Sequence, residues 1–186
     1  MKVILIGYRA TGKTTVGRRL SKQLKIPFLD TDHLIEQTEV LPIKDLIARD
    51  GWSAFRRKEQ EVIASLQGRE LCVVATGGGA ILAEENRLLL KSLGPVIYLK
   101  AFLPEILERL TRDAKNSQVR PQFTTESLAD ETVAVLAERI PLYESAADFT
   151  VETEGKSIVR VADEIYEYLL ETGAVSEIIK ARKKMK

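Results

Sequence analysis

The chain alternates short apolar runs with longer segments in which apolar residues recur every three or four positions. Near-continuous apolar runs are typical of parallel strands that helices cover on both faces. These runs predict five strands, at Val3–Ile6, Pro27–Leu29, Leu71–Ala75, Val96–Leu99 and Phe149–Glu152. Their alternation with helical segments predicts an α/β fold built from parallel βαβ units.

Eight segments have helical periodicity. They are Lys13–Leu24, His33–Glu39, Ile43–Arg49, Ser53–Leu66, Glu84–Leu93, Pro104–Arg112, Glu126–Tyr143 and Ser157–Glu171. In the first of them Val16, Leu20 and Leu24 form one stripe, as in a helix packed on a core. Pro141 is expected to kink or break the seventh.

The first strand and helix are joined by GYRATGKT, which matches the phosphate-loop pattern G-x-x-x-x-G-K-[ST] at residues 7–14. In that context the loop N–H groups and the positive helix end hold phosphate oxygens. Lys13 would contact the β- and γ-phosphates, and the Thr14 hydroxyl would bind Mg²⁺. The candidate nucleotide-binding residues are Ala10, Thr11, Gly12, Lys13, Thr14 and Thr15. An ordinary glycine turn, with Thr15 on the helix surface, is the alternative.

Asp30 and Asp32 follow the second strand, at the edge where ligands bind in an open parallel sheet. One acid could hold Mg²⁺, and the other could accept a hydrogen bond from a substrate hydroxyl. The residues alone leave open which acid takes which role, and a helix N-cap at Asp32 is the alternative. His33, the single histidine, is expected at the surface.

Three glycines, Gly77, Gly78 and Gly79, follow the third strand. Without side chains their N–H groups can approach a ligand closely, so they are candidate substrate-binding residues. Many phosphate-loop enzymes carry a second acidic motif at this position. Because this chain does not, the acid beside the metal should be Asp30 or Asp32.

Two arginines lie on helix faces that are otherwise apolar. Arg56 is at the edge of the stripe that contains Phe55, whereas Arg57 points away from it. Arg139 shares a face with Leu128, Thr132, Val135 and Tyr143. A guanidinium on an inward face needs a carboxylate partner, which indicates a substrate that carries a carboxylate and hydroxyls. For Arg56 a pair with Glu59 is the alternative.

Residues 112–125 are polar and poorly periodic, which predicts a lid. Arg112, Lys115 and Arg120 could close onto nucleotide phosphates, and an arginine supplied in cis to the γ-phosphate is a recurring catalytic device. A solvated loop with scattered charge is the alternative.

The chain has 186 residues, 45% hydrophobic and 30% charged, with a net charge of +1. These values predict one domain, which we place at residues 1–172. The segment at about 33–62, which carries Arg56, is expected to be an insertion that binds the acceptor. The net charge gives no reason to expect a nucleic-acid partner. The basic segment 173–186 is expected to be a frayed, solvated terminus. Lone Cys72, the absence of a signal peptide and the absence of a long apolar run predict a cytoplasmic protein with no membrane partner.

Taken together, the motifs resemble those of shikimate kinases. The matching segments are GYRATGKTT, FLDTD (Phe28–Asp32), GWSAFRRKE (Gly51–Glu59), ATGGGA (Ala75–Ala80), Arg120-Pro121 and ERIPLYESAAD (Glu138–Asp148). They occur in the family's order over residues 2–170. The chain departs from the family at Gln122 and Phe123, where two leucines are usual, and in lacking lid glycines at 113–119.

The resemblance implies a monomeric kinase of nucleoside-monophosphate-kinase-like fold, with a five-stranded parallel sheet. It would transfer the γ-phosphoryl group of Mg·ATP to the 3-hydroxyl of shikimate. It also implies roles for single residues. Lys13 and the loop would hold the phosphates, Thr14 would bind Mg²⁺, and Asp32 and Gly78 would contact shikimate hydroxyls, which leaves Asp30 as the acid for Mg²⁺. Arg56 and Arg139 would bind the carboxylate, Arg120 would reach the phosphates, and Arg112 and Lys156 would lie beside adenine.

Two other functions fit parts of the pattern. Another small hydroxy-acid kinase, such as a gluconate kinase, would keep the phosphate loop but need not keep both inward arginines. A regulatory or chaperone-like nucleotide-binding module could use the fold without catalysis. Retention of Lys13, Thr14, Asp32 and both arginines argues against the second.

Overall fold

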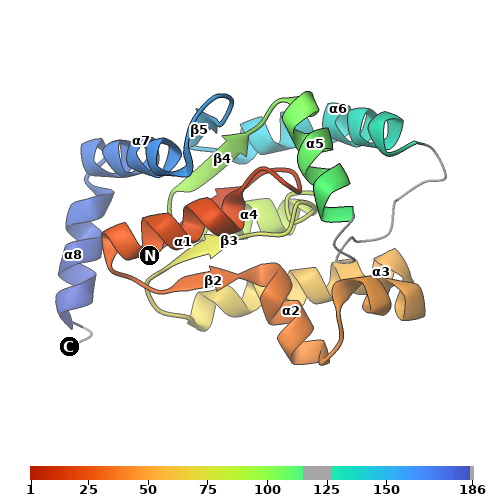
Figure 1. Cartoon of the computed structure of the whole chain (residues 1–186). Helices are drawn as coiled ribbons and strands as arrows, with labels where there is room; N and C mark the ends of the chain where they lie inside the picture. Colours follow the sequence, from red (N-terminus) through yellow and green to blue (C-terminus); the bar gives the residue numbers. More distant parts are fainter. Residues whose placement is uncertain (115–126, 185–186) are drawn as a thin grey trace.

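A five-stranded parallel sheet forms the centre of the molecule in the computed structural model, which describes residues 1–114 and 127–184 (Figure 1). The spatial order of the strands is β2-β3-β1-β4-β5, and every neighbouring pair is parallel. The strands are β1 (Lys2–Ile6), β2 (Phe28–Asp30), β3 (Cys72–Ala75), β4 (Val96–Lys100) and β5 (Phe149–Glu152). All five predicted strands are confirmed, with ends that differ by at most one residue.

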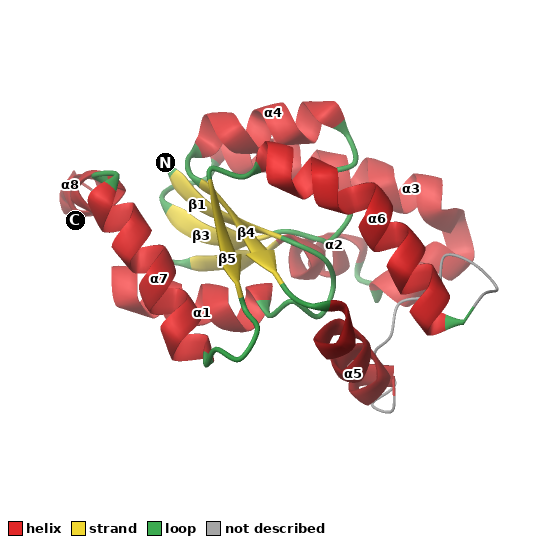
Figure 2. Cartoon of the chain, turned by 90° about the horizontal axis from the view of Figure 1, so that it is seen from above, coloured by secondary structure: helices red, strands yellow, loops and turns green. Residues whose placement is uncertain are grey.

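Helices cover both faces of the sheet, giving three layers (Figure 2). One face carries α1 (Lys13–Leu24), α7 (Ile158–Glu171) and α8 (Ala174–Lys184). The other carries the end of α3 (Ile43–Ser65), the short 3₁₀ helix η1 (Leu66–Gly68), α4 (Glu84–Leu93) and α6 (Leu128–Ala146). Successive strand residues point to opposite faces, so Val3 and Leu5 join the first apolar cluster whereas Ile4 and Ile6 join the second.

Two further helices lie at the sheet's carboxyl edge. Helix α2 (Thr31–Glu39) packs on α3 through a separate small cluster that contains Ile35 and Phe55. Helix α5 (Leu103–Ala114) follows β4 and inserts Ile106 into the core of the second face. Strand β1 lies between β3 and β4. The chain forms β2 and β3 on one side of β1 and then β4 and β5 on the other, which creates a crevice at the carboxyl end of β1.

Local side chains determine where two of these helices begin and bend. Helix α2 begins at Thr31, two residues before the predicted start, because the Asp30 carboxylate accepts hydrogen bonds from the N–H groups of Asp32 and His33. The N-cap is therefore Asp30, and the alternative that placed it at Asp32 is wrong. The two helices predicted at 43–66 join into α3, but Gly51, with φ of 80°, interrupts the helical geometry between them.

Two expectations for the C-terminal third do not hold in full. The break expected at Pro141 is wrong, because α6 continues five residues beyond it, and a kink there stays a prediction. The segment after Gly173 is not frayed as far as residue 184, because it forms α8. Val175 and Ile178 of α8 are buried in the first apolar cluster, and Arg182 donates to the carbonyl of Leu24 at 3.1 Å. The prediction for this segment relied on its basic composition and overlooked the apolar residues that recur at helical spacing in α8.

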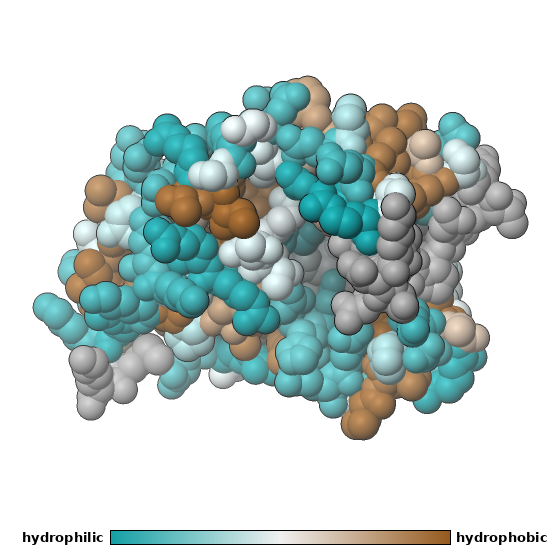
Figure 3. Space-filling view, in the orientation of Figure 1, coloured by the Kyte–Doolittle hydropathy of each residue, from teal (hydrophilic) through white to brown (hydrophobic). Residues whose placement is uncertain are grey.

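The surface shown in Figure 3 is mostly hydrophilic, and its hydrophobic residues form small separate groups. Among the described helices, none combines the length and apolar composition that crossing a membrane requires. Cys72 is buried and His33 is exposed, as predicted.

Candidate active site

The phosphate loop leaves β1 in a backbone conformation that its glycines make possible. Gly7 has φ of 145° and a Cβ there would come within 2.7 Å of the Leu99 carbonyl oxygen. Gly12 has φ of 91° and stands at the N-cap of α1 without a side-chain cap. The first N–H groups of α1 are therefore left for a ligand at the positive end of the helix.

Lys13 curls back over the loop. Its ammonium donates to the carbonyl oxygens of Gly7 at 2.8 Å and Tyr8 at 2.6 Å, and the residue is 8% exposed. The charge is thus held at the mouth of the loop by two main-chain acceptors, on the side where phosphate oxygens would lie.

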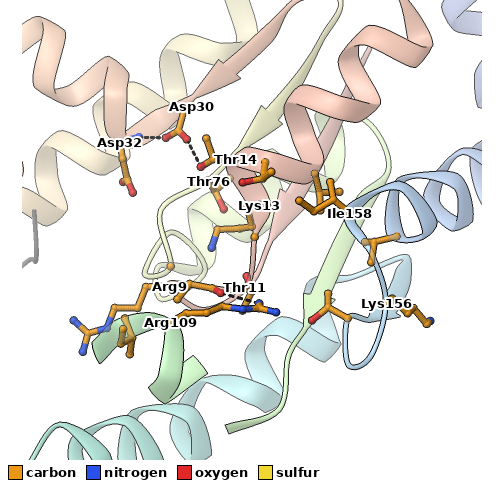
Figure 4. A pocket seen from close by; sticks show the side chains of 18 of the residues that line it. Arg9, Thr11, Lys13, Thr14, Asp30, Asp32, Thr76, Arg109, Lys156 and Ile158 are labelled. Atoms are coloured by element: carbon orange, nitrogen blue, oxygen red, sulfur yellow. Dashed lines mark hydrogen bonds between the residues drawn. The ribbon is translucent and has the colours of Figure 1, made fainter. Parts of the chain in front are cut away.

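A polar chain connects the loop to the end of β2. The Thr14 hydroxyl donates to Asp30 Oδ2 at 2.8 Å, and the other oxygen of Asp30 caps α2 (Figure 4). Asp32 lies two residues further along, half-buried, beside the same cavity. The structure therefore brings together the threonine and the two acids that the sequence singles out.

These groups open into a cavity of about 650 Å³ (Figure 4). Every predicted nucleotide-binding residue within the described ranges lines it; these are Ala10, Thr11, Gly12, Lys13, Thr14, Thr15, Arg112 and Lys156. Asp30, Asp32 and Gly78 line it as well. Arg120 and Lys115, together with lid residues 115–125, lie outside the described residues.

The outer wall of the cavity is built from α5 and α7. Arg112 pairs with Glu108 at 3.1 Å and Lys156 pairs with Glu164 at 2.7 Å, so both predicted cations have carboxylate partners. Arg109, which sequence reasoning missed, donates to the carbonyl of Ala10 at 3.1 Å. Its pairing with Glu105 four residues earlier resembles an ordinary surface pair in the sequence, which is why it carried no signal.

Arg56, on α3, lies against Gly79 in the glycine segment that follows β3. Its guanidinium pairs with Glu59 at 2.6 Å and lies over the rings of Trp52 and Phe55, at 5.5 and 5.2 Å. The Arg56 side chain is 24% exposed, whereas that of Glu59 is 1% exposed. Arg57 is exposed, as predicted. The Glu59 pair expected as an alternative does form, and it leaves part of the guanidinium accessible.

The three glycines make room for these charged groups. A Cβ at Gly77 would lie 2.5 Å from Glu59 Oε1 and 2.7 Å from Asp32 Oδ1, and one at Gly79 would overlap the Arg56 guanidinium. The N–H group of Gly77 donates to Thr31 Oγ1 at 2.9 Å. The expectation that this N–H faces a ligand is therefore wrong for Gly77, because Thr31 already accepts its hydrogen bond.

Arg139 approaches the same glycines from α6. It is 6% exposed, and both its Nη1, at 3.4 Å, and the Tyr143 hydroxyl, at 2.5 Å, donate to the carbonyl of Gly78. Burial lowers the pKa of Arg139, and the nearby positive charge of Arg56 acts in the same direction. Two cations that disfavour each other's charge at close range would be stabilised by a bound anion.

One further ion pair ties the phosphate loop to α6. Arg9 Nη2 contacts Glu131 at 2.9 Å, and Glu131 is 1% exposed. The pair joins residues 122 positions apart in the chain. Sequence reasoning missed it because neither residue matches a motif and such separations leave no local pattern.

The donor set suits Mg²⁺ bound together with a nucleotide. No group of three or more His, Cys, Asp or Glu side chains that could hold a metal by itself occurs within residues 1–114 and 127–184. Mg²⁺ in kinases takes one or two protein oxygens and completes its shell with phosphates and water. The contacting oxygens of Thr14 and Asp30 fit that requirement.

Comparison with known proteins gives consistent matches along most of the chain. The model of the family described as "Shikimate kinase" matches residues 9–170. The shikimate kinase of Syntrophus aciditrophicus is 43% identical over 171 residues, which cover 88% of each chain. That of Francisella tularensis subsp. novicida is 41% identical over 170 residues, covering 91% of this chain and 94% of its own.

Solved structures of shikimate kinases also superpose on most of this chain. Shikimate kinase from Acinetobacter baumannii in complex with shikimate superposes with a TM-score of 0.85 at 36% identity, covering 92% of this chain and 93% of that one. The enzyme from Aquifex aeolicus gives a TM-score of 0.78 at 33% identity, covering 93% and 98%.

Proposed function

The chain belongs to the shikimate kinase family and is an ATP-dependent kinase, and we propose that it phosphorylates the 3-hydroxyl of shikimate with the residues of the cavity and the arginine pair. One observation carries the assignment of the acceptor. Arg139 reaches Gly78 and Arg56 lies against Gly79, in the glycine segment that contacts the phosphate loop through Gly78 and Asp32 through Gly77. A carboxylate between the guanidiniums would place ring hydroxyls toward the nucleotide.

The nucleotide would occupy the 650 Å³ cavity. Loop amides and Lys13 would hold the phosphates, and Thr14 with Asp30 would hold Mg²⁺, which neutralises charge on the β- and γ-phosphates. Arg112 and Lys156 would border the adenine. We keep Arg120 in the proposal as the lid arginine on the strength of the family resemblance.

The acceptor hydroxyl would be oriented by Asp32. Its Oδ1 is buried beside Gly77, in a position to accept the hydroxyl proton as the bond to phosphorus forms. Gly78 and Gly79 admit the ring because they present no side chain. In such a site most of the acceleration comes from alignment and from fixed positive charge rather than from covalent chemistry.

The proposal also covers the oligomeric state of the protein, its location in the cell and the type of its partners. The monomeric state is proposed from the family resemblance. The buried thiol Cys72, the single cysteine of the sequence, supports a reducing, cytoplasmic location. The near-neutral net charge of +1 supports small molecules rather than nucleic acid as partners.

The test is ADP formation in a coupled assay with Mg·ATP and either shikimate or gluconate. We expect turnover with shikimate alone, and we expect Lys13→Met to remove it while the protein remains folded. Turnover with gluconate but not with shikimate would indicate that the protein is another hydroxy-acid kinase. ATP binding without turnover for either acceptor would support a non-catalytic module.

A further inference from the structure

The side chain of Tyr8, the second residue of the phosphate loop, has no role in the account above. Tyr8 is 1% exposed and packs in the apolar cluster of the second sheet face, together with Tyr98 and Tyr143. Its hydroxyl oxygen is buried and has no hydrogen-bond partner among the residues that the structure describes. Most buried polar atoms are paired, so a buried hydroxyl without a partner calls for an explanation.

Tyr8 borders the groups assigned to the acceptor through its backbone and through the apolar cluster that it shares with Tyr143. A Cβ at Gly78 would lie 3.5 Å from the Tyr8 carbonyl carbon, so the two backbones are in contact. The Gly78 carbonyl in turn accepts from Tyr143 and Arg139. Tyr8 is also among the groups that act on the pKa of Arg139, together with Arg56.

We propose that the Tyr8 hydroxyl is a third group that binds the acceptor, donating a hydrogen bond to the carboxylate that Arg56 and Arg139 hold. The inference rests on the proposed function. A carboxylate has about four lone-pair sites, and two guanidiniums approaching from different helices leave room for a neutral donor. The phenol would thereby gain the partner that it lacks without ligand.

Packing alone does not account for the hydroxyl. Phenylalanine would fill the same volume in the cluster and would keep the ring beneath the Arg9 guanidinium, 5.5 Å from its centroid. It would also avoid burying an unpaired polar atom, which is unfavourable. A bound molecule that accepts its hydrogen bond would give the hydroxyl a role that phenylalanine could not fill.

The test is Tyr8→Phe, with Tyr98→Phe as the matched control. Tyr98 is 3% exposed and belongs to the same cluster, but the charge that acts on its hydroxyl is that of Glu144. We expect Tyr8→Phe to raise the KM for shikimate at least tenfold, because a hydrogen bond to a charged group is lost. The KM for ATP should stay within twofold, and the melting temperature should not fall. Tyr98→Phe should leave both KM values within twofold.

An analogue of shikimate with a hydroxymethyl group in place of the carboxylate makes the assignment specific. With it, the effect of Tyr8→Phe on KM should shrink to less than threefold. An unchanged KM for shikimate in a stable Tyr8→Phe protein would overturn the proposal, as would an equal effect on the analogue. Failure of the proposed function is separate, because it would appear as wild-type protein that releases no ADP with shikimate.

Discussion

Replacing Gly79 by alanine tests whether this position needs glycine to leave space for the Arg56 side chain or to let the backbone turn. Gly79 does not have a positive φ, so alanine is compatible with the backbone. A Cβ at this position, however, would overlap the central carbon and both terminal nitrogens of the Arg56 guanidinium. Because that guanidinium is the end of a flexible side chain, we expect Arg56 to move and the backbone to stay.

Two opposing effects set the change in stability. A Gly→Ala change at a permitted backbone conformation stabilises by about 0.4–1 kcal/mol through the unfolded chain. Weakening the hydrogen bond between Arg56 and buried Glu59 costs about 1.5–3 kcal/mol. The free energy of unfolding should therefore fall by only about 1–2 kcal/mol, and the variant should fold.

The effect on function should be larger and selective. If Arg56 no longer reaches the acceptor carboxylate, the loss of about 1.5–3 kcal/mol in binding raises the KM for shikimate about ten- to a hundredfold. The KM for ATP should remain within twofold, since Arg56 does not line the nucleotide cavity.

The assay is coupled ADP release at saturating Mg·ATP with shikimate varied. The control is Gly68→Ala, because Gly68 also lacks a positive φ and a Cβ there would meet nothing within 4 Å. Gly68→Ala should behave as wild type. A folded Gly79→Ala protein with a KM for shikimate within twofold of wild type would refute the reasoning.

Three shorter predictions follow from other parts of the structure. Arg56→Ala should raise the KM for shikimate about tenfold or more, whereas exposed Arg57→Ala, one residue away, should change it less than twofold; equal effects would contradict the acceptor assignment. In denaturant titrations Ile178→Ala should lower the free energy of unfolding by about 2–4 kcal/mol and Ile179→Ala, which is 44% exposed, by under about 1 kcal/mol; similar small losses would mean that α8 does not pack. Burial raises the pKa of the Cys72 thiol, so at pH 8 a thiol reagent should label native protein at least about a hundredfold more slowly than unfolded protein, and equal rates would contradict its burial.

The fold could be predicted because its signals are local. Strand runs such as Val96–Leu99 are apolar throughout, and their alternation with helical periods specifies a parallel sheet. Errors occurred where a side-chain cap or a contact with a distant part of the chain decides the outcome. Asp30 starts α2 early by capping it, and Val175 and Ile178 dock a segment whose basic composition indicated fraying.

The candidate site could be predicted in part for the same reason. Lys13, Thr14 and Asp32 stand in motifs or at strand ends, so their residue types and places were enough to single them out. Arg9 and Glu131 stand in no motif, and only the folded chain brings their opposite charges together. At Gly79 the missing side chain makes room for Arg56, and no local sequence pattern shows that contact.

The central claim is that the paired guanidiniums fix shikimate by its carboxylate and thereby present one hydroxyl to the nucleotide. Two-dimensional ¹H–³¹P NMR of the product formed from shikimate and Mg·ATP tests this most directly. The account predicts a single phosphorylated product whose phosphorus couples to the ring proton at carbon 3. Phosphorus coupled to a proton at another ring carbon, or a mixture of positions, would contradict it.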